Sequence, residues 1–93
     1  AELNNAGIEL ERKGKIDQAI LIYEECITIG YPARHSYNRL MILYRRHKDR
    51  ENEVRIIEAA INMFSETNGY SGEIIKWQNR LQKVKALIYK PNQ

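Results

Sequence analysis

The side chains best suited to catalysis or metal binding in this chain are two histidines, His35 and His47, and one cysteine, Cys26. Twelve positions separate the histidines, which is about 120° on an ideal helix, so they would not converge on one metal ion. Cys26 falls in an apolar stripe where a small residue packs, and the neighbouring glutamates have no partner histidine. The glycines form no glycine-rich phosphate loop. We therefore expect no enzyme activity, no metal and no cofactor.

A second chemical feature is a run of cations that begins at Arg34. Residues 34–55 carry seven basic and three acidic side chains, whereas residues 1–33 carry three basic and six acidic ones. Such a patch suggests an acidic partner, and it makes nucleic acid the alternative to a protein partner. Cations at a helix C-terminus are also favourable for structural reasons, and no segment stands out as a recognition helix. The phosphate-contacting candidates are Arg34, Arg39, Arg45, Arg46, Lys48, Arg50 and Arg55.

Helices must position these side chains, because the sequence holds only two prolines and is rich in helix-forming residues. Apolar residues recur at helical spacing in five segments, separated by Gly14, by the break at Gly30–Pro32, by the turn before Asp49 and by the loop 65–69. Asp49 is expected to cap the fourth helix. The expected helices span about 2–13, 16–29, Pro32 to His47, 50–64, and Ser71 or Gly72 to near Tyr89, where Pro91 ends the last one.

The apolar residues of the first half recur after 34 positions. The matched pairs are Leu3 and Tyr37, Ala6 and Leu40, Leu10 and Tyr44, Ile20 and Val54, Tyr23 and Ile57, Cys26 and Ala60, and Ile27 and Ile61. A period of this length, built from two helices, is typical of a helical solenoid, whose units bury their apolar faces against one another. The stripe of Leu3, Ala6 and Leu10, with Gly7 as an optional fourth member, is predicted to face inward.

The motifs of the two units resemble the tetratricopeptide-repeat (TPR) family. The first-helix pattern reads Leu3-x-x-Ala6-Gly7-x-x-Leu10 and Tyr37-x-x-Leu40-Met41-x-x-Tyr44, and the second-helix pattern reads Ala19-x-x-x-Tyr23-x-x-Cys26. The resemblance implies an all-α, right-handed helical-hairpin solenoid in a single domain, with repeats at about 1–31 and 32–65 and a capping helix at about 70–89. Met41 and Glu53 replace the small residues of the second unit, so that hairpin is expected to be splayed or tilted.

TPR proteins usually bind extended peptides in a concave groove lined by their first helices. Projecting that geometry on this chain predicts a groove of amides, aliphatic residues and cations, which suits an extended, possibly acidic, segment of another protein or of the same chain. Arg45, Lys76 and Lys83 would hold acidic groups through charge-assisted hydrogen bonds. The groove residues are Asn4, Ile8, His35, Asn38, Ile42, Arg45, Lys76, Asn79 and Lys83.

Three further expectations concern the setting of the chain. A single cysteine fits a reducing compartment, so we expect a cytoplasmic protein, and no apolar run approaches the length of a membrane span. The chain begins with alanine and not with methionine, so an excised domain and a processed product are both open interpretations. Trp77 is predicted to anchor the last helix on the fourth, and self-association as a homodimer stays open.

Overall fold

The computed structural model describes residues 2–30 and 34–89, and every regular element in them is an α-helix, so the all-α fold class is confirmed. The positions of Pro32 and Pro91, predicted to start one helix and end another, lie outside the described residues. All helix boundaries fall within two residues of the expected ones. The helices are α1 (Glu2–Arg12), α2 (Ile16–Thr28), α3 (Arg34–Arg46), α4 (Arg50–Phe64) and α5 (Ser71–Ile88).

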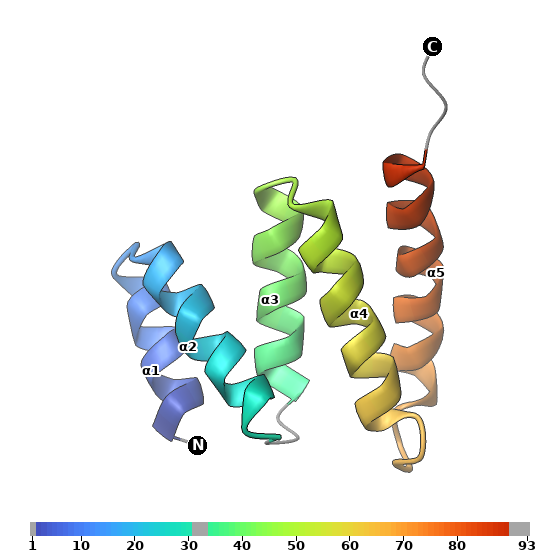
Figure 1. The fold of residues 1–93 in the computed structure, drawn as a ribbon. Helices are drawn as coiled ribbons and strands as arrows, with labels where there is room; N and C mark the ends of the chain where they lie inside the picture. The colour runs from blue at the N-terminus through green and yellow to red at the C-terminus, as the bar shows by residue number, and fades with distance from the viewer. Residues whose placement is uncertain (1, 31–33, 90–93) are drawn as a thin grey trace. The chain divides into compact units, whose positions relative to one another are not determined.

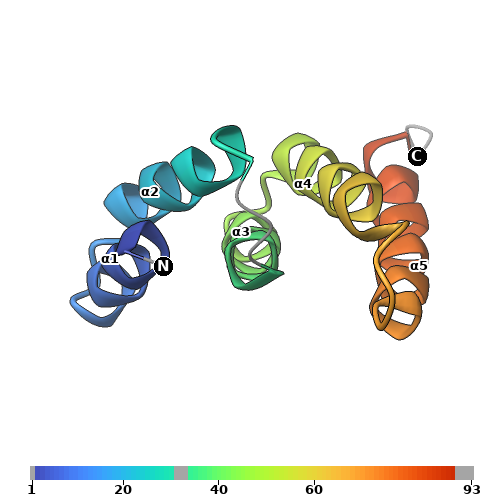
Figure 2. The same ribbon diagram turned by 90° about the horizontal axis from the view of Figure 1, so that it is seen from below.

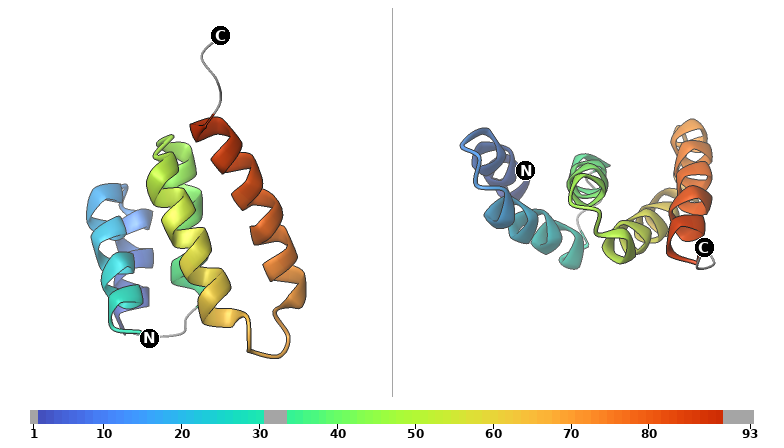
Figure 3. Two further views of the ribbon diagram at one scale, coloured as in Figure 1. Left: turned by 45° about the vertical axis from the view of Figure 1, so that its right-hand side comes forward. Right: turned by 90° about the horizontal axis from the view of Figure 1, so that it is seen from above.

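The chain divides into two compact units, Ala1–Leu43 (unit 1) and Tyr44–Gln93 (unit 2). In unit 1, α1 and α2 run antiparallel and pack against each other (Figures 1 and 2). α3 belongs to unit 1 up to Leu43, and its residues 44–46 belong to unit 2. In unit 2, α4 and α5 form the second antiparallel pair (Figures 1 and 3).

The contact between α1 and α2 depends on Gly7. A Cβ atom on this buried residue would overlap the ring of Tyr23, so the absence of a side chain lets α2 lie close to α1. Ala19 and Cys26, which lie about one turn before and after Tyr23 on α2, are small and are also buried. The prediction that Ala6 faces inward is wrong, because it is exposed. Helix α1 turns the edge carrying Gly7 toward α2, and Ala6, about 100° away on the helix, is left in solvent.

Unit 2 is held together by aromatic packing and by one buried carboxylate. The ring of Trp77 lies 5.8 Å from that of Phe64 on α4, and both residues are buried, which confirms Trp77 as the anchor of α5. Tyr70 stacks on Phe64 from the loop that precedes α5, at 4.6 Å. Glu53, which stands where the resembled family has a small residue, is fully buried and paired with Arg80 of α5.

Helices α1 and α3 end in the same left-handed turn. After α1, Gly14 has a φ of +77°, and Lys15 N–H donates to the Leu10 carbonyl at 2.9 Å. After α3, Lys48 has a φ of +57°, and Asp49 N–H donates to the Tyr44 carbonyl at the same distance. Both are Schellman turns, in which the left-handed residue lets the chain satisfy the last carbonyls of the helix. The predicted cap of α4 is also confirmed, because Asp49 Oδ1 accepts from Asn52 N–H at 3.3 Å.

Candidate functional site

Glu11 connects all three helices of unit 1. Its carboxylate accepts two hydrogen bonds from the guanidinium of Arg39 on α3, from Nη2 to Oε1 at 2.6 Å and from Nε to Oε2 at 2.9 Å. The hydroxyl of Tyr23 on α2 donates to Oε2 at 2.6 Å. A two-pronged arginine–carboxylate pair has a defined geometry as well as a favourable energy. The position of the Arg39 guanidinium on the surface of unit 1 is therefore fixed.

These contacts also fix the charge states of the three groups. The hydrogen bond from Arg39 lowers the pKa of Glu11, and the one from Tyr23 adds to this, while burial partly opposes both. The same pair raises the pKa of Arg39. Burial, followed by the bond to Glu11, raises the pKa of Tyr23 well above its ordinary range. Glu11 therefore remains an acceptor and the other two groups remain donors around neutral pH.

A second cluster of hydrogen bonds centres on Asn4. The Asn4 Oδ1 atom accepts from the Ser36 hydroxyl at 2.8 Å, and it lies 3.0 Å from Nδ1 of His35, which donates when it carries the proton. The His35 ring also meets the ring of Tyr23 nearly edge-on, at 6.0 Å and 67°. Contacts with two other helices thus orient the exposed His35 before any ligand arrives.

An open hollow of about 350 Å³ lies over these two clusters, between α1 and α3 of unit 1. Ile8, with 39% of its surface exposed, provides its apolar part. The remainder is charged or polar, with Arg12 at the rim held by an exposed pair with Glu9. The lining residues are Ile8, Glu11, Arg12, His35 and Arg39.

The two first helices of the expected repeats present the same pair of side chains. Asn4 and Ile8 on α1 recur 34 positions later as Asn38 and Ile42 on α3. Both asparagines are half-buried, and the isoleucines are 39% and 37% exposed. Unit 1 therefore carries an amide and a partly exposed aliphatic side chain twice, on helices that Glu11 and Arg39 connect.

The predicted groove residues are distributed over both units. Five of them lie in unit 1, where the structure brings Ile8 and His35 into one hollow and places Asn4 in contact with His35. Arg45, Lys76, Asn79 and Lys83 belong to unit 2, and all four are exposed. On α5 the last three fall within a sector of about 60°, because they follow at i, i+3 and i+7.

Sequence reasoning missed the groups that order this surface. Glu11 is not among the expected groove residues, and Arg39, expected as a phosphate-contacting cation, is paired with Glu11. Ser36, which is fully buried, was not singled out. The available signal was an acidic residue and a basic residue on the two expected first helices, 28 positions apart, and this signal alone does not select the pair.

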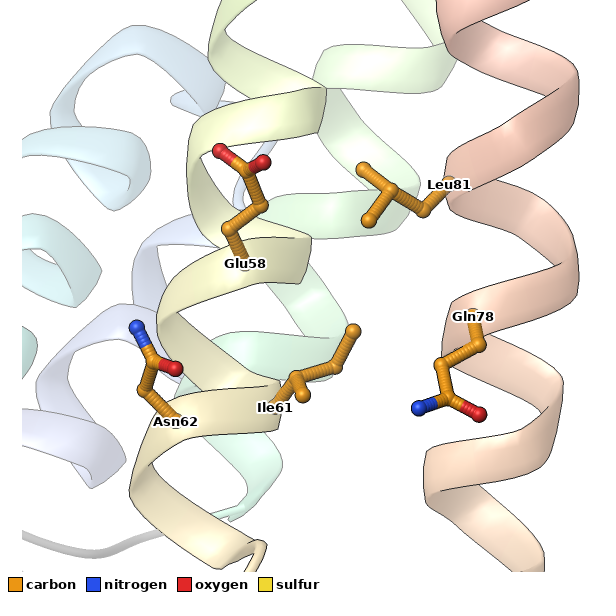
Figure 4. A pocket seen from close by; sticks show the side chains of 5 residues that line it. All are labelled: Glu58, Ile61, Asn62, Gln78 and Leu81. Atoms are coloured by element: carbon orange, nitrogen blue, oxygen red, sulfur yellow. The ribbon is translucent and has the colours of Figure 1, made fainter.

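Unit 2 contains its own hollow, of about 490 Å³, between α4 and α5. Figure 4 shows Ile61 and Leu81 directed toward each other across it, Gln78 directed into it from α5, and Glu58 and Asn62 on the α4 side. The Nζ atom of Lys85 lies 3.3 Å from the Glu58 carboxylate. The hollow is thus lined by two aliphatic side chains, two uncharged amides and one carboxylate, and the carboxylate is paired.

The basic patch is only partly available for binding. Arg45, Arg46 and Lys48 are exposed where α3 ends, and Arg50 is half-buried at the start of α4. Arg39 is engaged by Glu11, and Arg55 donates to Asn52 at 3.1 Å. The exposed Arg45, Arg46 and Lys48 therefore form a short elbow where α3 ends, and the exposed Arg34 lies at the first residue of the same helix, so the patch is not a continuous basic stripe.

The chain matches no protein-family model, no curated protein and no solved structure. Among residues 2–30 and 34–89, no three histidine, cysteine, aspartate or glutamate side chains gather closely enough to hold a metal ion. No helix within the described ranges is long and apolar enough to cross a membrane. Function must therefore be argued from the surfaces of the two units.

Proposed function

We propose that this chain is a non-catalytic, TPR-like interaction scaffold, with two helical hairpins and a capping helix, that binds an extended peptide segment. The observation that carries the proposal is the repeated pair of an amide and a partly exposed isoleucine, Asn4 with Ile8 and Asn38 with Ile42, on α1 and α3. A repeated pair suits a ligand that is itself periodic. Buried, free Cys26 fits a reducing compartment, and we place the protein in the cytoplasm.

The proposed mechanism is rigid presentation. An asparagine amide both donates and accepts, so Asn38 can bind the N–H and the C=O of an extended backbone. The Oδ1 atom of Asn4 already contacts Ser36 and His35, so Asn4 can donate from Nδ2 to a backbone C=O. The neighbouring isoleucines give shallow apolar contact. Contacts within unit 1 already hold Asn4, His35 and Arg39 in place. Little side-chain entropy is then lost on binding, which favours affinity for a small contact area.

The preference for an acidic ligand comes from the exposed cations of the chain. The Glu11–Arg39 pair cancels its own charge, so the attraction is assigned to exposed residues of unit 2: Arg45, Lys76 and Lys83. Exposed charges mainly accelerate encounter and make it sensitive to salt. Binding of an acidic peptide should therefore weaken as ionic strength rises.

The test is an NMR titration of the ¹⁵N-labelled chain with the acidic peptide acetyl-Glu-Ala-Leu-Ala-Asp-amide, alongside a basic peptide in which lysines replace the acids. We expect the side-chain amide signals of Asn4 and Asn38 to move with the acidic peptide and to saturate. Asn38→Ala should weaken binding by at least fivefold, whereas Asn68→Ala, in the exposed loop before α5, should leave it unchanged. Unmoved Asn4 and Asn38 signals, or equal binding by both variants, would refute the proposed groove.

Nucleic acid is the second candidate, and the exposed elbow of Arg45, Arg46 and Lys48 favours it. Light scattering of the chain at two salt concentrations, with and without a short random single-stranded DNA, separates the two. A complex that forms with DNA and is lost at the higher salt would replace the peptide proposal. A chain indifferent to DNA would leave the peptide surface of unit 1 as the leading candidate.

A further inference from the structure

The outward face of α2 carries an acidic and aliphatic row. Four residues at intervals of four form one ridge along the helix: Asp17, Leu21, Glu25 and the C-cap residue Ile29. Both acids are exposed, and 69% of Leu21 and 62% of Ile29 are in contact with solvent. Two large aliphatic side chains exposed on one short ridge suggest a contact surface.

The outward face of α5 carries a basic and aliphatic row of the same kind. Ile75, Asn79, Lys83 and Leu87 also follow at intervals of four. Ile75 is 58% exposed and Leu87 45%, and the charged position in the row is the exposed Lys83. Each ridge runs over 13 residues, about 18 Å of helix, so the two are equal in length.

We propose that these two ridges bind each other between copies of the chain, with α2 of one copy crossing α5 of the next. Ridges of residues four apart interdigitate in the commonest class of helix packing, at about −50°. Such a crossing places the middle of one ridge on the middle of the other. Glu25 then lies beside Lys83 and Leu21 beside Asn79, with Ile75 and Leu87 flanking the crossing.

The charges decide which pairing forms. Two α2 ridges would bring acids against acids, and two α5 ridges would bring Lys83 against its own copy, so symmetric pairing is opposed by like charges. Only the pairing of an α2 ridge with an α5 ridge joins opposite charges, and this pairing also covers Leu21. Because that contact uses different surfaces on the two copies, it can repeat and extend into a chain of molecules.

The inference does not rest on the proposed peptide function. The α5 ridge shares Asn79 and Lys83 with the predicted groove, but the α2 ridge shares no residue with it. Glu25→Lys therefore reports on self-association alone, and it should leave the peptide titration of Asn4 and Asn38 unchanged.

The experiment is analytical ultracentrifugation of the chain from about 10 µM to 1 mM at low and high salt, because a surface of this size supports only weak association. We expect the average mass to rise above the monomer mass of 11.0 kDa with concentration, and to fall back at high salt. Leu21→Ser should weaken association at least threefold. A mass that stays at the monomer value throughout would overturn the inference.

The decisive experiment exchanges the two charges at the crossing. Glu25→Lys and Lys83→Glu should each abolish association alone, because each variant places like charges at the crossing. An equimolar mixture of the two should associate again, because the altered α2 ridge of one meets the altered α5 ridge of the other. Glu66→Lys, a reversal in the exposed loop outside both ridges, is the matched control and should associate like the parent. Failure of the mixture to associate, with both variants folded by circular dichroism, would refute the pairing.

Discussion

The carboxylate of Glu53, 2% exposed, accepts two hydrogen bonds from the guanidinium of Arg80, at 2.7 Å from Nε and 3.2 Å from Nη2. The pair joins α4 to α5 across the interior of unit 2. Burying a carboxylate is costly unless its charge is paired and its oxygens are hydrogen-bonded, and Arg80 supplies both requirements. The acid at a position where the resembled family has a small residue is therefore compensated from the next helix.

Removal of Arg80 should be among the most damaging single changes in unit 2. Arg80→Ala leaves an unpaired buried charge, so we expect the free energy of unfolding to fall by about 3–5 kcal/mol in urea titrations. Glu53→Ala should cost less, because Arg80 is partly exposed and can reach water. Lys85→Ala is the control, since its pair with Glu58 is about half exposed and should contribute less than about 1 kcal/mol. Equal losses from Arg80→Ala and Lys85→Ala would contradict the structural role of the buried pair.

Replacement of glycine by alanine should have opposite effects on stability at Gly7 and at Gly72. At Gly7 a Cβ atom would overlap the Tyr23 ring, so Gly7→Ala should lower the melting temperature, with a loss of about 1–3 kcal/mol. At Gly72, in the first turn of α5, nothing lies within 4 Å of the added atom and φ is ordinary. Gly72→Ala should therefore stabilise by about 0.5–1 kcal/mol. Thermal unfolding of the two variants checks both signs, and a stabilising Gly7→Ala would show that α1 and α2 are not in close contact.

The helices could be predicted from sequence because each signal acts locally. Apolar spacing, Gly14 and Asp49 define where helices begin and end, and none of these signals needs knowledge of the remaining chain. The burial of Cys26 and Trp77 followed from the same periodicity. The TPR-like arrangement remains a proposal, because it concerns how helices of different units are placed.

The candidate site was less predictable because its order comes from pairs distant in sequence. The contacts of Glu11 with Arg39 and of Glu53 with Arg80 span 28 and 27 positions, and helical spacing alone does not select the partner of a charge. Each of the four residues could equally have been a solvated surface charge. Ser36 was missed because a buried hydroxyl is acceptable only with a partner, here Asn4, which a single sequence does not identify.

Acid should remove the contribution of Glu11. The pKa of this carboxyl in the folded chain lies below its ordinary 4.5, so the pair with Arg39 stabilises the fold above about pH 4.5 and is lost as pH falls through the folded value. At pH 7 the free energy of unfolding of Glu11→Gln, measured by urea titration, should thus be lower than that of the parent by about 2 kcal/mol. This difference should shrink below pH 4. Glu9→Gln, in an exposed pair, should differ little from the parent at either pH. A gap for Glu11→Gln that is constant from pH 7 to pH 3 would exclude the charge as its source.

The free energy of unfolding should change in opposite directions when glycine and lysine are exchanged at the left-handed turns after α1 and α3. Lys48 occupies, at a φ of +57°, the position that Gly14 occupies 34 residues earlier, and a side chain with a Cβ atom is strained there by about 1 kcal/mol. Lys48→Gly should therefore raise the free energy of unfolding by about that amount, and Gly14→Lys should lower it similarly. Lys48→Ala separates strain from charge, because it removes the ammonium group and keeps the Cβ atom. If Lys48→Ala stabilises as much as Lys48→Gly in urea titrations, the gain comes from reduced repulsion within the basic elbow and not from the turn.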